Sequence, residues 1–155
     1  MILENQWRID PKPIIPKRLK NHVKIFSNCK LSKQEVILFN ISLQSVANYL
    51  EHDSIDLSDY HTLNIVFTEN GKISFHDTKD NVNGMQIYMA IYKMMQLRKK
   101  GSSSFSLFVF IEELVHYFWR ISDETIVKYK VTEIMQTIVA DFTIEIAKGW
   151  GLYGL

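Results

Sequence analysis

Residues 105–133 read FSLFVFIEELVHYFWRISDETIVKYKVTE, and the residues of greatest chemical interest lie in this stretch. Apolar residues recur every three to four positions along its first half, which predicts a largely buried helix. The apolar positions are Leu107, Phe110, Ile111, Leu114, Phe118 and Ile121. A narrow polar stripe interrupts them, in which Glu112, Glu113 and His116 form the sequence E-E-x-x-H and Arg120 and Asp123 follow.

The polar stripe has three interpretations, because residues three or four positions apart are neighbours on a helix. In the first, Glu112 and His116 ligate a metal ion and Glu113 activates a bound water, as in H-E-x-x-H metallopeptidases. In the second, Glu113 and His116 are the E-x-x-H pair of a di-metal carboxylate protein, together with Glu133. In the third, the stripe is the ordinary polar face of an amphipathic helix, stabilised by a Glu–His pair.

The segment E-E-L-V-H-Y-F resembles the H-E-L-x-H-Y-F stretch of zincin-like metallopeptidases. The closer likeness is to the small ImmA/IrrE-type domains found with mobile-element regulators. In that family a second helix follows, with an acidic start and a pattern near E-A-N-x-F-A-x-E-L-L. Here Asp123 and Glu124 open the next predicted helix, and residues 131–135, VTEIM, are similar to its later part.

This resemblance implies a metal site of Glu112, His116 and Glu124, with Glu113 as the catalytic residue and zinc or another divalent ion as cofactor. The chain departs from the family pattern at the first histidine, which is Glu112, and near Ile126, where the third ligand is expected. Carboxylates also ligate zinc. Two functions follow: a metal-dependent hydrolase acting on peptide bonds or, alternatively, a non-catalytic interaction or regulatory protein with a degenerate zincin-like fold.

Composition narrows the class of partner. The 155 residues are expected to form a single domain, 1–155, with an extended N-terminal segment, 1–16. The apolar tail, 149–155, either folds back onto the core, which is the commoner case, or docks into a partner. A net charge of +1 argues against a dominant role with nucleic acid or anionic membranes. The resemblance implies a peptide or protein as substrate or partner. The lone Cys29, the lack of a membrane-spanning apolar run and the lack of a signal-peptide pattern predict a cytoplasmic protein.

The rest of the chain predicts an α+β fold, with about four main helices and a small antiparallel sheet built on one β-hairpin. The hairpin would join residues 63–67 to 73–75 through Glu69-Asn70-Gly71, with Gly71 at positive φ. Residues 22–26 fit a short strand or a helical turn equally well.

Helices account for the remaining elements. Ser32 and Glu35 form a capping box that begins a helix over 33–51. A helix over 85–97 would place Met85, Tyr88, Met89, Tyr92 and Met95 on one side, and Gly101 would follow its end. A final helix over 123–148 would be capped by Ser122.

Overall fold

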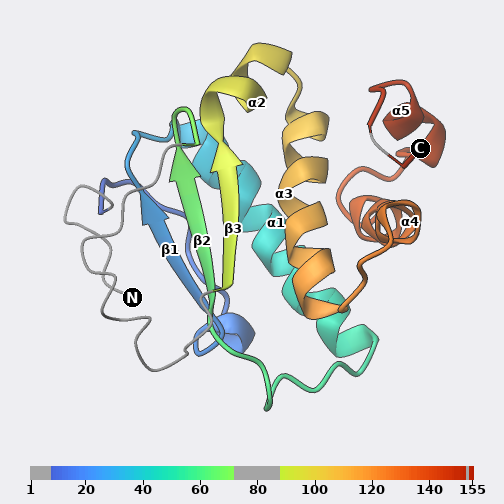
Figure 1. Cartoon of the computed structure of the whole chain (residues 1–155), viewed down its shortest axis with the longest axis horizontal. Helices are drawn as coiled ribbons and strands as arrows, with labels where there is room; N and C mark the ends of the chain where they lie inside the picture. Colours follow the sequence, from blue (N-terminus) through green and yellow to red (C-terminus); the bar gives the residue numbers. More distant parts are fainter. Residues whose placement is uncertain (1–7, 72–87, 153) are drawn as a thin grey trace.

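The computed structural model describes residues 8–71, 88–152 and 154–155, which form an α+β arrangement with a three-stranded sheet (Figure 1). The elements in chain order are η2 (Lys17–Leu19), β1 (Val23–Ser27), α1 (Lys33–His52), β2 (Leu63–Thr68), β3 (Tyr88–Lys93), α2 (Met94–Lys100), α3 (Ser103–Phe118), α4 (Glu124–Met135) and α5 (Ile144–Lys148).

All three strands run parallel in the order β1-β2-β3, so the predicted antiparallel hairpin is wrong. Ile65 in β2 pairs with Ile25 in β1 and with Ala90 in β3, and both edges of β2 are therefore occupied by parallel strands. Gly71 does have positive φ, at 84°, but among the described residues β2 pairs with parallel strands only. The second arm of that hairpin, 73–75, lies outside the described residues.

Residues 88–93 form strand β3, where a helix over 85–97 was predicted. The Met and Tyr residues are spaced three to four positions apart, which favours a helix. The observed burial instead alternates with a period of two, as in a strand. Ala90 and Tyr92 are buried, whereas Ile91 and Lys93 are exposed. The helix begins only at Met94 and ends before Gly101, whose φ of 65° gives the left-handed C-cap expected from the sequence.

The capping-box prediction for α1 is confirmed. Ser32 Oγ accepts a hydrogen bond from the Glu35 amide at 3.1 Å, and Glu35 Oε1 accepts one from the Ser32 amide at 2.8 Å. Because two amides at the helix start are satisfied locally, the sequence defines this end without help from distant contacts. α1 is also the crossover between parallel strands β1 and β2.

The predicted helix 123–148 is divided into α4 and α5. Its cap is Asp123 rather than Ser122, because the Asp123 carboxylate accepts hydrogen bonds from the amides of Thr125 at 2.9 Å and Ile126 at 2.8 Å. The tail folds back onto the core as predicted, and the Trp150 ring packs within 6 Å of the rings of Phe105, Phe108 and Phe142.

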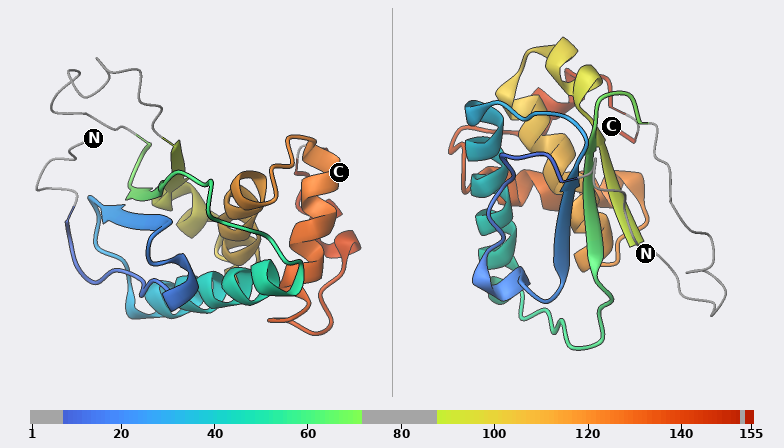
Figure 2. Two further views of the ribbon diagram at one scale, coloured as in Figure 1. Left: turned by 90° about the horizontal axis from the view of Figure 1, so that it is seen from below. Right: turned by 90° about the vertical axis from the view of Figure 1, so that its left-hand side faces the viewer.

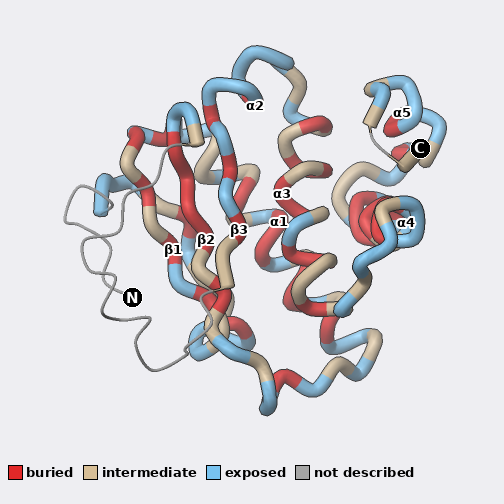
Figure 3. The backbone as a smooth tube through the Cα atoms, viewed as in Figure 1, coloured by how far each residue is buried: buried red, intermediate tan, exposed pale blue. Residues whose placement is uncertain are grey.

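The elements form three layers. α1 and α3 lie against one face of the sheet, and α4 packs on the side of these helices that faces away from the strands (Figure 2). Buried positions follow β2 and the facing sides of α3 and α4 (Figure 3). Among the described residues, no helix combines the length and the apolar character that a membrane crossing needs.

A polar cluster at the end of α1 joins the helical layers. The Asp53 carboxylate, whose side chain is 21% exposed, accepts hydrogen bonds from Lys130 Nζ at 2.9 Å and Trp119 Nε1 at 2.7 Å. His52 Nδ1 lies 2.9 Å from its other oxygen. Burial by itself raises the pKa of Asp53, but the hydrogen bonds outweigh burial and lower the pKa to about 2.

This cluster makes stability depend on pH. Because the folded-state pKa of Asp53 lies below its unfolded value, its stabilisation is present above pH 4 and is lost as pH falls towards 2. Asp53→Asn should therefore cost about 2 kcal/mol at neutral pH and almost nothing near pH 2. Urea unfolding of both proteins across this range measures the difference. A cost that does not change with pH would contradict the assignment.

Candidate functional site

The E-E-x-x-H sequence lies in the last two turns of α3, a helix that packs against the core on most of its sides. Ser102 caps its start by accepting a hydrogen bond from the Phe105 amide at 3.2 Å. Phe110, Ile111, Leu114 and Phe118 are fully buried, as the apolar periodicity predicts, and so is Val115. The carboxylates and the imidazole therefore project from a backbone whose rotation about its axis is fixed by packing.

The structure brings together the three residues predicted as metal ligands. The donor atoms of Glu112, His116 and Glu124 all lie within 4.8 Å of one another. His116 Nε2 is 3.9 Å from Glu112 Oε1 and 3.6 Å from Glu124 Oε1. α3 ends at Phe118, and the chain turns back through Arg120, which has a φ of 54°, so that the first turn of α4 faces the last turn of α3.

One hydrogen bond of the His116 ring fixes the tautomer of the neutral imidazole. Its Nδ1 lies 2.6 Å from the carbonyl oxygen of Ile121, and a carbonyl only accepts, so Nδ1 carries the proton. In its neutral form, His116 therefore presents the Nε2 lone pair on the side of the two carboxylates. A backbone carbonyl behind the imidazole is also the arrangement that orients histidine ligands in metal proteins.

Lys128, which the sequence interpretation did not include, occupies the same cluster. Its side chain is only 2% exposed. Nζ donates to Glu112 Oε1 at 3.0 Å, to Glu124 Oε2 at 3.0 Å and to the Glu124 carbonyl at 3.2 Å. An ammonium group has three protons, so every donor of this buried cation has an acceptor.

The donor geometry fits a metal ion, but the ammonium of Lys128 weakens the attraction of the two carboxylates for one. Atoms bound at about 2.1 Å around one tetrahedral ion lie roughly 3.4 Å apart, which is close to the observed spacing. An ion on Glu112 Oε1 would lie at most about 5 Å from Lys128 Nζ, because that oxygen is 3.0 Å from Nζ. Charges of two and one at that distance repel by about 7 kcal/mol at an effective dielectric constant of about 20. This repulsion alone, apart from the attraction of the two carboxylates, corresponds to about five powers of ten in affinity.

Glu113 is not one of the three grouped donors. The sequence interpretation likewise assigned it to a bound water rather than to the metal. Its side chain is exposed, yet the protein around it removes enough water to raise the pKa of its carboxyl group. His116 opposes this shift, whereas the negative charges of Glu112 and Glu124 add to it. A raised pKa suits a group that exchanges protons, but no proton-transfer partner within hydrogen-bonding distance is present among the described residues.

The di-metal interpretation does not agree with the geometry. Glu133 accepts hydrogen bonds from the Tyr49 hydroxyl at 3.0 Å and from Lys130 Nζ at 3.1 Å. It belongs to the Asp53 side of α4 and is absent from the group around His116 in the described part of the chain. Glu113 and His116 therefore lack the second carboxylate that this interpretation needs.

The sequence contained a signal for Lys128. It follows Glu124 by four residues, the spacing of a stabilising Glu–Lys helix pair.

Comparison of the chain with protein-family models, with curated proteins and with solved structures gives no match.

Proposed function

We propose that this protein is a non-catalytic interaction domain with a zincin-like site in which the Lys128 ammonium takes the place of a metal ion. The observation that carries the proposal is the hydrogen bonding of Lys128, which joins both carboxylates of the ligand group at 3.0 Å. The internal cation neutralises one of the two carboxylates and ties α4 to α3. The burial of the single cysteine, Cys29, supports a reducing compartment, and we propose a cytoplasmic location.

The second candidate is the hydrolysis of peptide bonds with zinc or another divalent metal. It is favoured by the donor triangle and by the Ile121 carbonyl behind His116. In this case Glu112, His116 and Glu124 would hold the ion, and Glu113 would hold a proton beside it. The ion would supply Lewis-acid chemistry, and Lys128 would first have to leave its three acceptors.

Paired substitutions of the two adjacent glutamates separate the candidates. If Lys128 is the cation, Glu112→Gln should lower the free energy of unfolding by about 1–3 kcal/mol, because a buried ammonium loses a charged acceptor. Glu113→Gln is the matched control, and it should change stability by about 0.5 kcal/mol or less. Urea unfolding measures both values.

Zinc should then leave the melting temperatures of the wild type and of both variants unchanged. The metal candidate gives a different pattern: wild-type protein purified without a metal-affinity tag would carry about one equivalent of zinc, and Glu112→Gln would lose it. Elemental analysis distinguishes these results, and the second pattern would overturn our proposal.

A further inference from the structure

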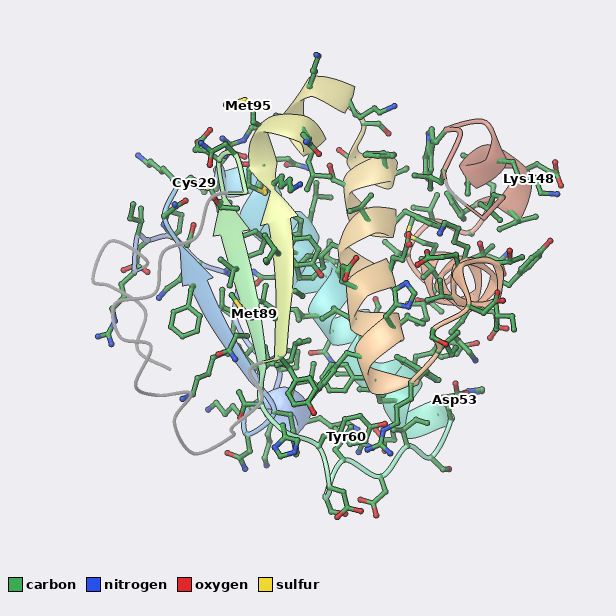
Figure 4. All side chains as sticks on the ribbon, viewed as in Figure 1. Cys29, Asp53, Tyr60, Met89, Met95 and Lys148 are labelled. Carbon is green, nitrogen blue, oxygen red and sulfur yellow. The ribbon has the colours of Figure 1, made fainter. Side chains whose placement is uncertain are left out.

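A cavity of about 330 Å³ opens beside His116, near the end of α3. It is lined by Asp59, Tyr60, His61, Tyr88, His116, Tyr117 and Arg120. These residues come from the loop between α1 and β2, from the start of β3 and from the end of α3. Figure 4 shows Tyr60 in that loop, at the end of the sheet where α3 also ends.

The aromatic walls of this cavity are held in place. The Tyr60 hydroxyl donates to the Phe118 carbonyl at 2.6 Å, and the Tyr117 hydroxyl donates to the His61 carbonyl. Because both protons are used on the backbone, these rings offer the cavity mainly their faces and edges. The rings of His61 and Tyr88 are stacked, with centroids 5.3 Å apart and planes within 15°.

Arg120 adds a flat cation to the same wall. Its guanidinium carbon lies 4.4 Å from the centroid of the Tyr60 ring, within the range of a cation–π contact. Its backbone has a φ of 54°, directly after the last turn of α3, where glycine is the favoured residue. Glycine suits this backbone conformation, so an Arg120→Gly variant would remove the side chain without straining the backbone.

We infer that this cavity binds one aromatic side chain of a peptide or protein partner. The inference rests on the proposed function, because it names the partner chemistry of an interaction domain. Ring faces and a guanidinium plane favour a flat, π-bearing ligand, and the volume suits one large side chain. Asp59 and Arg120 both line the cavity and carry opposite charges, so the cavity selects for a ring rather than for an anion such as a nucleic-acid phosphate.

The experiment is a titration of ¹⁵N-labelled full-length, metal-free protein with N-acetyltryptophanamide, followed by NMR. We expect shifts of the backbone amides of residues 59–61 and 116–120. N-acetylleucinamide, which is apolar but not aromatic, should bind at least several-fold more weakly. Equal binding of the two amides would overturn the inference, as would tighter binding of adenosine, which would assign the cavity to nucleobases.

Two glycine variants separate the role of the Arg120 side chain from folding. Arg120→Gly should keep or raise the melting temperature, because glycine tolerates positive φ, and should weaken binding of N-acetyltryptophanamide about three- to tenfold. Ser54→Gly is the matched control, because Ser54 also has positive φ, at 53°, but does not line the cavity. It should leave binding unchanged. Unchanged binding in Arg120→Gly would contradict the inference.

The zinc results are independent of these titrations. If the wild type binds the aromatic amide and also binds zinc, the non-catalytic proposal fails, and the cavity becomes a substrate pocket for aromatic residues. If the wild type binds neither ligand, the cavity inference is overturned while the role of Lys128 stands.

Discussion

Lys128→Met should lower the free energy of unfolding by about 3 kcal/mol. Removing one partner of a buried ion pair typically costs about 3–5 kcal/mol, because the opposite charge is left without compensation. Glu112 is only 15% exposed, but Glu124 is 40% exposed and is partly screened by water, so the cost should fall at the low end of this range. Methionine keeps much of the volume of the lysine stem, so that the loss reports on charge rather than on packing.

Urea unfolding at neutral pH measures this cost, and two further variants test its origin. Lys148→Met removes an exposed lysine from an i,i+3 pair with Glu145 and should change stability by about 0.5 kcal/mol or less. Adding Glu112→Gln to Lys128→Met should recover part of the loss, because the double variant no longer buries that unpaired carboxylate. A single variant as stable as the wild type would show that Lys128 does not act as the cation of this cluster.

Phe110→Ala should cost about 3–5 kcal/mol, as is typical for a phenylalanine removed from a close-packed core. The Phe110 ring is fully buried, and its centroid lies 4.7 Å from those of both Phe39 and Tyr92 and 6.0 Å from that of Phe67. It therefore joins α3 to α1 and to two strands. The loss of this ring should loosen α3, which carries Glu112 and His116.

Val109→Ala is the control for Phe110→Ala. Val109 is the preceding residue of α3 and is only half-buried, so its truncation should cost about 1 kcal/mol or less. Thermal or urea unfolding gives both values. A cost below about 1 kcal/mol for Phe110→Ala would mean that the ring is not the centre of the interface between the sheet and the helices.

Local signals explain which elements the sequence predicts correctly. The capping box at Ser32 and Glu35 and the helical periodicity of residues 105–118 are defined by neighbours in the chain, and both helices form. Strand pairing is not local. Asn70-Gly71 has the composition of a hairpin turn, but β2 pairs instead with strands that lie about 20 to 40 residues away in the sequence. A strand buried on both faces is typical of a parallel sheet, and the run Leu63–Thr68 fits that pattern.

The sequence predicts which three residues form the ligand group, but it does not predict the buried positive charge of Lys128 beside them. Glu112 and His116 follow from helix spacing, and Glu124 joins them because the chain reverses after α3 and returns through the first turn of α4. A sequence pattern cannot show that Lys128 reaches across to α3, because that contact depends on how closely α3 and α4 pack. In our proposal, this one side chain makes the site an internal ion pair rather than a metal centre.

Zinc binding by the wild type and by Lys128→Met, measured side by side by calorimetry, tests the central claim most directly. If Lys128 takes the place of a metal ion, the wild type should bind no zinc at micromolar concentrations. Lys128→Met should gain a site, because Glu112, His116 and Glu124 are then free of the ammonium and zinc can replace its charge. About one equivalent of zinc bound tightly by the wild type, with no gain in the variant, would contradict this account.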